Sequence, residues 1–287
     1  MMTERYGLAP LSLERCSINT ATLGHRLPIE AIIDLVARFG FGAIAPWRRD
    51  LDGRSVTAIA RRIREAGLAL SGYCRSTYFP ASTPGQFKAN VADNLRALND
   101  AALLGAPCFV LVVGSLPAGE RDLDAARAQV IEGLALLLEQ ARTCGVALAL
   151  EPLHPMYAGD RSCVTSLGEA LAICEALDPE QRGGIGVAID VYHVWWDALL
   201  SEGIRKAGEA GRVCAFHVCD WLVPTRDLLL DRGMMGDGVI DIPKIRGLVE
   251  QAGYRGFIET EIFSRDWWGR PESEILAACV ERLTSRC

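Results

Sequence analysis

Lysine and histidine are scarce in this chain, and no segment concentrates one sign of charge. Of the 30 basic residues only three are lysines, there are four histidines, and the formal net charge is −6. No run of five or six like charges forms the basic stripe or tail with which many proteins follow a nucleic-acid backbone. We therefore expect no nucleic-acid partner.

Long apolar runs and disulfide patterns are missing as well. The longest apolar stretches, Cys108–Val113 and Val146–Leu150, are much shorter than a membrane-spanning helix. The N-terminal residues MMTERYGLAPLSLERC lack the apolar segment of a secretory signal. Ten cysteines are scattered along the chain, and no two form a CxxC pair. These absences predict a reduced, cytoplasmic protein with no membrane partner.

The chain does contain a regular alternation of two kinds of segment. Apolar runs of about 5–8 residues predict strands, and longer segments with 3.6-residue periodicity predict helices. The expected strands are Leu13–Asn19, Gly42–Trp47, Leu68–Cys74, Pro107–Gly114, Val146–Glu151, Gly184–Asp190, Arg212–Val218 and Gly256–Phe263. The expected helices are Pro28–Phe39, Ser55–Ala66, Pro84–Leu104, Asp122–Cys144, Ser166–Leu177, Trp196–Ala210, Ile242–Ala252 and Pro271–Leu283.

Eight alternating units predict an α/β protein, namely a single (β/α)8 TIM barrel that covers residues 1–287 as one domain. Continuous apolar strands are typical of a parallel sheet that is covered on both faces, and right-handed crossovers close eight such units into a ring. An open doubly wound sheet is the alternative. It is less favoured because no strand is followed by a glycine-rich dinucleotide fingerprint.

Four of the expected strands end in polar side chains, where the active sites of such barrels lie. Strand alternation places Glu151, Asp190 and His217 on the inward face of three of them. The small residues that precede them on the same face fit a crowded barrel interior. In Gly256–Phe263 the residues Glu259 and Glu261 share one face, one layer apart, so this strand leaves some ambiguity.

Carboxylates that converge on the barrel axis would repel one another and resist ionisation, and a divalent cation removes that conflict. An oxygen-rich set with a single imidazole favours Mn²⁺ or Mg²⁺, and Co²⁺, Zn²⁺ or Fe²⁺ also suit it. We therefore expect one divalent metal ion per chain. Its candidate ligands are Glu151, Asp190 and His217, together with a glutamate of the last strand, Glu259 or Glu261.

The tryptophans also gather after strands, on the same side of the expected barrel. Indole faces suit the C–H surfaces of a sugar ring or polyol and exclude water from a site. Trp47 and Trp196 are the leading candidates for substrate contact, and the alternative for each is packing between loops or subunits.

Two histidines and two arginines complete the predicted substrate site. His154 and His193 are candidates for binding substrate oxygens, although a hydrogen bond that holds Asp190 is an equal alternative for His193. Residues 219–241 form a long expected loop with Arg226 and Arg232, which suit a carboxylate or phosphate group. The alternative for each is a solvated loop arginine.

The chain resembles the xylose isomerase-like sugar phosphate isomerase/epimerase barrels, which include inosose isomerases and dehydratases, ketose 3-epimerases and hydroxypyruvate isomerases. The resemblance spans essentially the whole chain. LEPLHP, DVYHVWW, FHVCD, TEIF and the glycine-rich DRGMMGDGVID carry it. It implies that the metal ligands are Glu151, Asp190, His217 and Glu261. In epimerase members of the family, the glutamates matching Glu151 and Glu261 also exchange protons with the substrate. Many relatives have Asn three residues after the first glutamate, where this chain has His154.

The expected function is a divalent-metal-dependent isomerase or epimerase of a small sugar, a polyol-derived ketone or a sugar phosphate. A bound metal would acidify the C–H beside a substrate carbonyl and stabilise the enediolate, with Glu151 and Glu261 as the acid-base pair. Loss of a β-hydroxyl from the same enediolate would instead give a dehydratase of a keto-inositol-like substrate. A metal-dependent endonuclease, which needs several metals and many histidines, and a non-catalytic sugar-binding barrel are less favoured. A homodimer or homotetramer is an open expectation.

Overall fold

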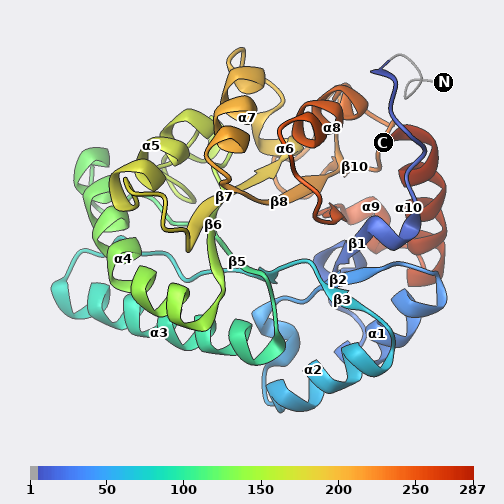
Figure 1. The fold of residues 1–287 in the computed structure, drawn as a ribbon, viewed down its shortest axis with the longest axis horizontal. Helices are drawn as coiled ribbons and strands as arrows, with labels where there is room; N and C mark the ends of the chain where they lie inside the picture. The colour runs from blue at the N-terminus through green and yellow to red at the C-terminus, as the bar shows by residue number, and fades with distance from the viewer. Residues whose placement is uncertain (1–5) are drawn as a thin grey trace.

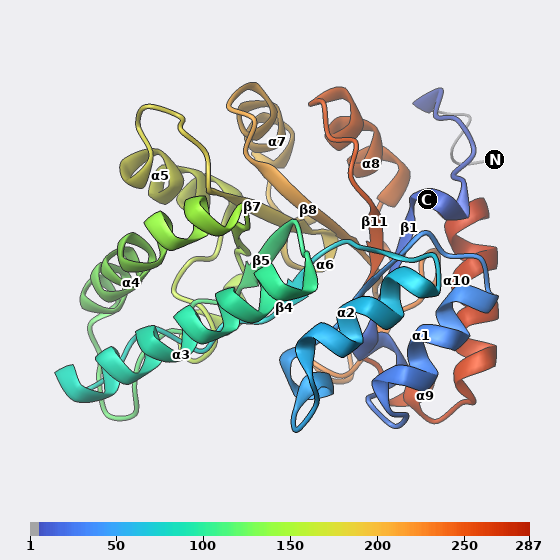
Figure 2. The same ribbon diagram turned by 60° about the horizontal axis from the view of Figure 1, so that its bottom comes forward.

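The computed structural model describes residues 6–287, and its parallel strands form a nearly closed ring with helices around it (Figures 1 and 2). Neighbouring strands in the sheet follow the order β3-β2-β1-β11-β8-β7-β6-β5-β4. Their bounds are β1 Cys16–Asn19, β2 Ala43–Ala45, β3 Ala69–Leu70, β4 Tyr73–Cys74, β5 Cys108–Leu111, β6 Ala147–Leu150, β7 Ile185–Asp190, β8 Val213–Val218 and β11 Ile258–Thr260.

The predicted third strand, Leu68–Cys74, supplies both ends of this order. Its first part, β3, pairs with β2, and its second part, β4, pairs with β5. A parallel bridge between Trp47 and Cys74 links the two sides, and β1 pairs with β11 at the opposite join. Eight predicted strands therefore complete the ring, and the predicted (β/α)8 barrel is confirmed.

The helices surround the sheet in both ribbon views, and α10 lies beside the start of the chain (Figures 1 and 2). Local capping fixes several of their ends: the Asp122 carboxylate accepts the N–H groups of the first turn of α4, and Gly145 ends this helix at a φ of 70°. Their bounds are α1 Ile29–Arg38, α2 Val56–Glu65, α3 Pro84–Leu104, α4 Leu123–Cys144, α5 Leu167–Leu177, α6 Val191–Val194, α7 Leu200–Glu209, α8 Ile242–Gln251, α9 Arg265–Trp268 and α10 Glu272–Arg286.

Most predicted strands are longer than the observed ones, and three segments show the differences from the structure. The helix expected over Trp196–Ala210 is α7, which begins only at Leu200, because Asp197 accepts the N–H of Leu199 and forms a turn first. The strand expected over Gly256–Phe263 is only β11. The long loop also contains structure, since β9 (Asp220–Trp221) pairs antiparallel with β10 (Arg232–Gly233).

The interior of the barrel is packed with small and sulfur-containing side chains. Ala149, Ala188 and Ala215 meet there with Cys74 and Cys108, all of them buried. These alanines are the inward positions that alternation predicts, and they leave room above them for larger polar groups.

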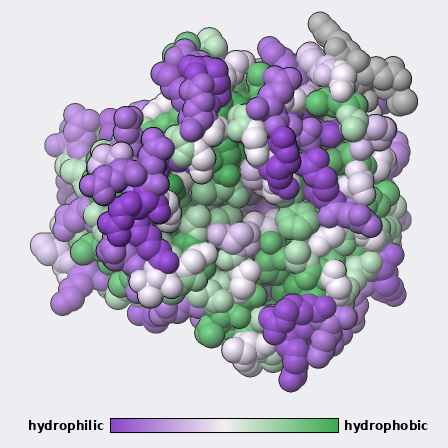
Figure 3. All heavy atoms as spheres, viewed as in Figure 1, coloured by the Kyte–Doolittle hydropathy of each residue, from purple (hydrophilic) through white to green (hydrophobic). Residues whose placement is uncertain are grey.

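Hydrophilic residues dominate the periphery of the face drawn in Figure 3, and hydrophobic residues lie towards its middle. No helix within residues 6–287 has the length and apolar character that crossing a lipid bilayer requires.

Candidate metal centre

The predicted metal ligands lie close together at the ends of four strands that are neighbours in the sheet, β6, β7, β8 and β11. Glu151 follows β6, Asp190 ends β7, His217 lies in β8, and Glu261 follows β11 by one residue. One ligand atom from each of the four lies within 4.8 Å of the others, and all four residues are buried. Two ligands on opposite sides of one ion lie about 4 Å apart at typical metal–ligand distances, so the four donors fit a single ion.

His217 occupies the centre of this group. Its Nδ1 lies 3.1 Å from Oε1 of Glu151, and its Nε2 lies 3.6 Å from Oε1 of Glu259. The strand register pairs His217 with Asp190 on one side and with Glu259 on the other. Among the described residues Nε2 of His217 has no hydrogen-bond partner, which is a costly arrangement for a buried polar atom.

Glu259 lies one layer deeper and has its own hydrogen bonds. The side-chain amide of Asn19 donates to its Oε1 at 2.8 Å, and the hydroxyl of Ser71 donates to its Oε2 at 2.7 Å. Glu259 therefore lies beside His217, while the group of four that could hold an ion contains Glu261. The geometry thus favours Glu261 over Glu259, and the ligand role of Glu261 stays a prediction.

Arg232 supplies a buried positive charge to the same group. Its Nη1 donates to Oδ2 of Asp190 at 2.8 Å and to Oε2 of Glu261 at 3.2 Å. The guanidinium lies over the rings of Tyr192 and Phe263, at 4.4 Å and 5.0 Å from their centroids. Aromatic faces on the guanidinium stabilise a cation that is cut off from water.

The pKa shifts show how the group accommodates its charges. Burial alone would raise the pKa of Asp190, but Arg232, together with His193, outweighs burial and lowers it. Burial raises the pKa of Glu261 well above its usual value, and although Arg232 opposes this shift, Glu151 adds to it. Burial alone would lower the pKa of His217, but Glu259 and then Glu151 outweigh it and raise that pKa.

Glu261 and His217 therefore both favour their protonated forms, which reduces the repulsion among the buried carboxylates. A divalent cation supplies the same positive charge without those protons. The donor set of three carboxylates and one imidazole suits Mn²⁺ or Mg²⁺, with Co²⁺, Zn²⁺ and Fe²⁺ as borderline alternatives. The residues present thus fit the predicted ion in chemistry, charge and spacing.

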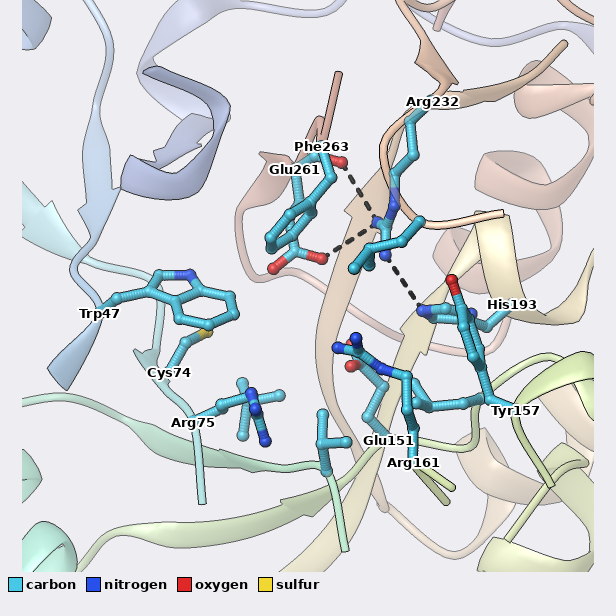
Figure 4. A pocket seen from close by; sticks show the side chains of 14 residues that line it. Trp47, Cys74, Arg75, Glu151, Tyr157, Arg161, His193, Arg232, Glu261 and Phe263 are labelled. Atoms are coloured by element: carbon cyan, nitrogen blue, oxygen red, sulfur yellow. Dashed lines mark hydrogen bonds and ion pairs between the residues drawn. The ribbon is translucent and has the colours of Figure 1, made fainter. Parts of the chain in front are cut away.

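A small pocket opens beside the four predicted ligands, and Figure 4 draws the side chains that line it. Glu151 and Glu261 line it together with His193 and Arg232, and Nη2 of Arg232 lies 3.1 Å from Nε2 of His193. Aromatic and apolar side chains form the other walls: Trp47, Val110, Val112, Leu153, Tyr157, Leu229 and Phe263. A few polar groups that converge in a mostly apolar pocket are typical of a small-molecule site.

Three predicted substrate-binding residues, Trp47, His193 and Arg232, line this pocket, and three others do not. His154 stacks on Trp221 with a centroid distance of 4.9 Å, and Nε1 of Trp196 donates to the backbone oxygen of His193 at 2.8 Å. Arg226 is exposed, and its guanidinium forms ion pairs with Asp231 and Asp266. Trp196 and Arg226 thus have contacts of their own away from this pocket, and the roles of all six remain predictions.

The pocket also contains two arginines that the sequence reasoning missed, Arg75 and Arg161. Arg75 directly follows β4, so its position after a barrel strand was a usable signal. Arg161 lies in the segment between β6 and α5, where no periodic pattern indicates which side chains turn inward.

A single carboxylate organises the segment that carries Arg232. Asp220 is buried and accepts four backbone N–H groups at 2.9–3.0 Å, which belong to Trp221, Gly236, Gly238 and Ile240. These bonds fold residues 221–240 back over the barrel. Arg232 in β10 is thereby directed at the ligands, while Arg226 stays at the surface.

A family model described as a xylose isomerase-like TIM barrel matches residues 33–285. Protein SMc04130 from Sinorhizobium meliloti 1021 is 50% identical, and its crystal structure superimposes with a TM-score of 0.92 over 96% of this chain and 99% of that chain. The IolI protein, whose crystal structure has a bound zinc atom, is 17% identical, with a TM-score of 0.79 over 93% of this chain and 96% of that chain. At that identity the likeness shows the fold alone.

An inosose isomerase from Halalkalibacterium halodurans is 27% identical over 139 residues, which are 46% of this chain and 45% of that protein. The match thus spans less than half of the length of this curated relative. The family model, by contrast, covers most of the chain, from α1 to the last turn of α10. The chain therefore belongs to the xylose isomerase-like TIM barrel family.

Proposed function

We propose that this protein is a divalent-metal-dependent isomerase or epimerase of a small sugar, a polyol-derived ketone or a sugar phosphate. The observation that carries the proposal is the buried group of four ligands, Glu151, Asp190, His217 and Glu261, at the wall of a small pocket. The inosose isomerase among the relatives supports the reaction class. The zinc atom of the IolI structure supports the use of a divalent ion.

In this proposal the four ligands hold one ion, with Mn²⁺ or Mg²⁺ favoured by the oxygen-rich set. When bound, the ion would polarise a substrate carbonyl and the hydroxyl on the adjacent carbon, which would acidify the C–H of that hydroxyl-bearing carbon. Arg232 keeps Asp190 ionised through its 2.8 Å contact with Oδ2. The aromatic walls of the pocket limit access of water.

Glu151 and Glu261 are the proposed acid-base pair. They enter the pocket from β6 and β11, which are separated by β7 and β8 in the sheet, so they approach a substrate from different directions. One carboxylate removes the proton beside the carbonyl, and the other returns a proton to the opposite face or to the neighbouring carbon. The first outcome is epimerisation and the second is aldose–ketose isomerisation.

The first test is the metal content of the purified protein, measured by mass spectrometry for the wild type, Glu261→Gln and His217→Ala. Glu175→Gln, a change at an exposed carboxylate, is the matched control. We expect about one divalent ion per chain in the wild type and the control, and a clear loss in both site variants. If the wild type takes up no stoichiometric ion after reconstitution with Mn²⁺ or Co²⁺, the proposed chemistry is wrong.

The second test is exchange of the α-proton of candidate ketoses and inososes with deuterated water, followed by NMR. Exchange that depends on both Glu151 and Glu261 supports the acid-base pair. An isomerised or epimerised product identifies the reaction within the class. A conjugated, ultraviolet-absorbing product would instead assign the protein as a dehydratase on the same site, because only elimination of a hydroxyl creates such a chromophore.

A further inference from the structure

Two arginines in the pocket, Arg75 and Arg161, have no carboxylate partner within residues 6–287. The only hydrogen bond of the Arg75 guanidinium runs from Nη1 to the backbone oxygen of Ser76 at 3.3 Å. The Arg161 guanidinium forms no hydrogen bond in the described part of the chain, and its Nε is buried without a partner. Arg232, in the same pocket, differs because Asp190 and Glu261 neutralise it.

Aromatic rings hold both guanidiniums in place. Arg75 lies over Tyr78 at 4.9 Å and near Trp47 at 6.0 Å, and Arg161 lies over Tyr157 at 5.1 Å, each from the ring centroid. Stacking on a ring uses the flat face of a guanidinium and leaves N–H groups at its edge free for a planar or tetrahedral anion. The two side chains are therefore fixed in position, and their donors remain available.

The charge balance of the pocket supports the same conclusion. Once the proposed divalent ion is bound, its two positive charges and that of Arg232 balance the three carboxylates Glu151, Asp190 and Glu261. No other acidic residue lines the pocket. Arg75 and Arg161 then contribute two positive charges that no carboxylate of the pocket lining pairs with, while Glu259 lies one layer deeper, outside that lining.

We propose that Arg75 and Arg161 form a subsite for an anionic group of the substrate, a carboxylate or a phosphate. This inference rests on the proposed function and narrows its substrate class to acidic sugars or sugar phosphates. In the view of Figure 4, Arg75 lies on the side of the pocket away from Arg232 and Glu261, and Arg161 and Glu151 both lie below Arg232. Both arginines line the same pocket as Glu151 and Glu261, so an anionic group that they hold belongs to a molecule at the candidate centre.

A shallow groove continues from this subsite to the surface and gives a larger anion room. It shares Trp47 and Arg75 with the pocket, and Arg48, Arg49 and Thr77 also line it. Arg48 is already paired with Asp93 at 2.9 Å, and Asp52 lines the groove as well. Arg75 is thus the arginine that belongs to both the pocket and the groove and has no carboxylate partner among the described residues.

The test compares three probes that share one carbon skeleton: glycerol 3-phosphate, glycerate and neutral glycerol. Isothermal titration calorimetry and tryptophan fluorescence give the affinity of each probe for metal-loaded and metal-free protein. We expect at least one anionic probe to bind about tenfold or more tightly than glycerol, since charge-assisted hydrogen bonds are the stronger ones. A preference for glycerol 3-phosphate identifies a phosphate subsite, and a preference for glycerate identifies a carboxylate subsite.

Variants assign the preference to the two side chains. Arg75→Gln and Arg161→Gln should each lower the affinity for the preferred anion by about tenfold to a hundredfold and leave the affinity for glycerol unchanged. Arg75→Lys should recover part of the loss, because it keeps the charge without the forked donors. Arg205→Gln, which changes an exposed arginine on α7 outside the pocket, is the matched control and should bind like the wild type.

Equal binding of all three probes by the wild type would overturn the subsite, and this result needs no variant to fold. Unchanged anion binding in both Gln variants, with native circular dichroism, would overturn it as well. The metal measurement keeps the two proposals apart. A protein that binds metal but shows no anion preference refutes only the subsite, and one that prefers the anion but binds no metal refutes only the proposed function.

Discussion

Arg232 provides the sharpest test of how the candidate centre is held together. The guanidinium is buried, donates to Asp190 and Glu261, and lies 3.1 Å from Nε2 of His193. Arg232→Met keeps much of the apolar stem and removes the charge. Breaking a buried ion pair by removing one partner costs about 3–5 kcal/mol of unfolding free energy, because the remaining charge stays buried without compensation.

That loss translates into an unfolding midpoint lower by roughly 6–10 °C, at about 2 °C per kcal/mol for a large domain. The measurement is thermal and urea unfolding of metal-free protein in the presence of a chelator. Arg205→Met is the matched control, because Arg205 and its ion-pair partner Glu209 are both exposed. We expect the control to unfold with the wild type, since exposed ion pairs contribute little.

Added Mn²⁺ separates this reasoning from a simple packing effect. In Arg232→Met the ion becomes the main positive charge near Asp190 and Glu261, so it should raise the unfolding midpoint more than in the wild type. If metal-free Arg232→Met is as stable as Arg205→Met, the guanidinium does not compensate the buried carboxylates. Our account of the charge balance would then be refuted.

Three further predictions follow from single contacts. Asp220→Ala leaves four backbone N–H groups without their acceptor, so it should lower the unfolding free energy by about 3 kcal/mol or more and speed limited proteolysis of residues 222–239. Burial is the main cause that lowers the pKa of His193 to about 3. Between that value and the ordinary 6.5, the unfolded state binds a proton that the folded state does not, so the unfolding free energy falls as the pH drops through this window. Urea titrations from pH 5.0 to 6.5 should show His193→Gln losing about 1 kcal/mol less per pH unit than the wild type, and parallel slopes would contradict this assignment. Glu259→Gln, which alters the carboxylate beside Nε2 of His217, should weaken Mn²⁺ binding by about tenfold or more in calorimetry with little change in circular dichroism, and unchanged affinity would refute that role.

The architecture could be predicted because local patterns encode it. Apolar runs and helical periodicity repeat along the chain, and only a few topologies bury eight such strands and eight such helices. The inward direction of Glu151, Asp190 and His217 follows from the two-residue period of a strand, which leaves no freedom once the core face is known. The structure brings these three side chains together with Glu261 as expected.

The residues of irregular segments could not be predicted in the same way. Nothing periodic distinguishes Arg226 from Arg232, yet one pairs with carboxylates at the surface and the other reaches the buried ligands. The difference arises from the hydrogen bonds of Asp220 and the pairing of β9 with β10, which join residues up to 20 positions apart. Arg161 was missed for the same reason.

The sequence by itself therefore determined the barrel and the strand ends at which its polar side chains converge, because strand and helix periodicity act over a few residues. Only the tertiary structure decided which arginines are neutralised and which remain available, and which of two neighbouring glutamates joins the ligands. Those outcomes depend on burial and on partners from distant segments, such as Asn19 and Ser71 for Glu259. The free energy of a charge is set by what surrounds it in space, and that environment exists only after the chain has folded.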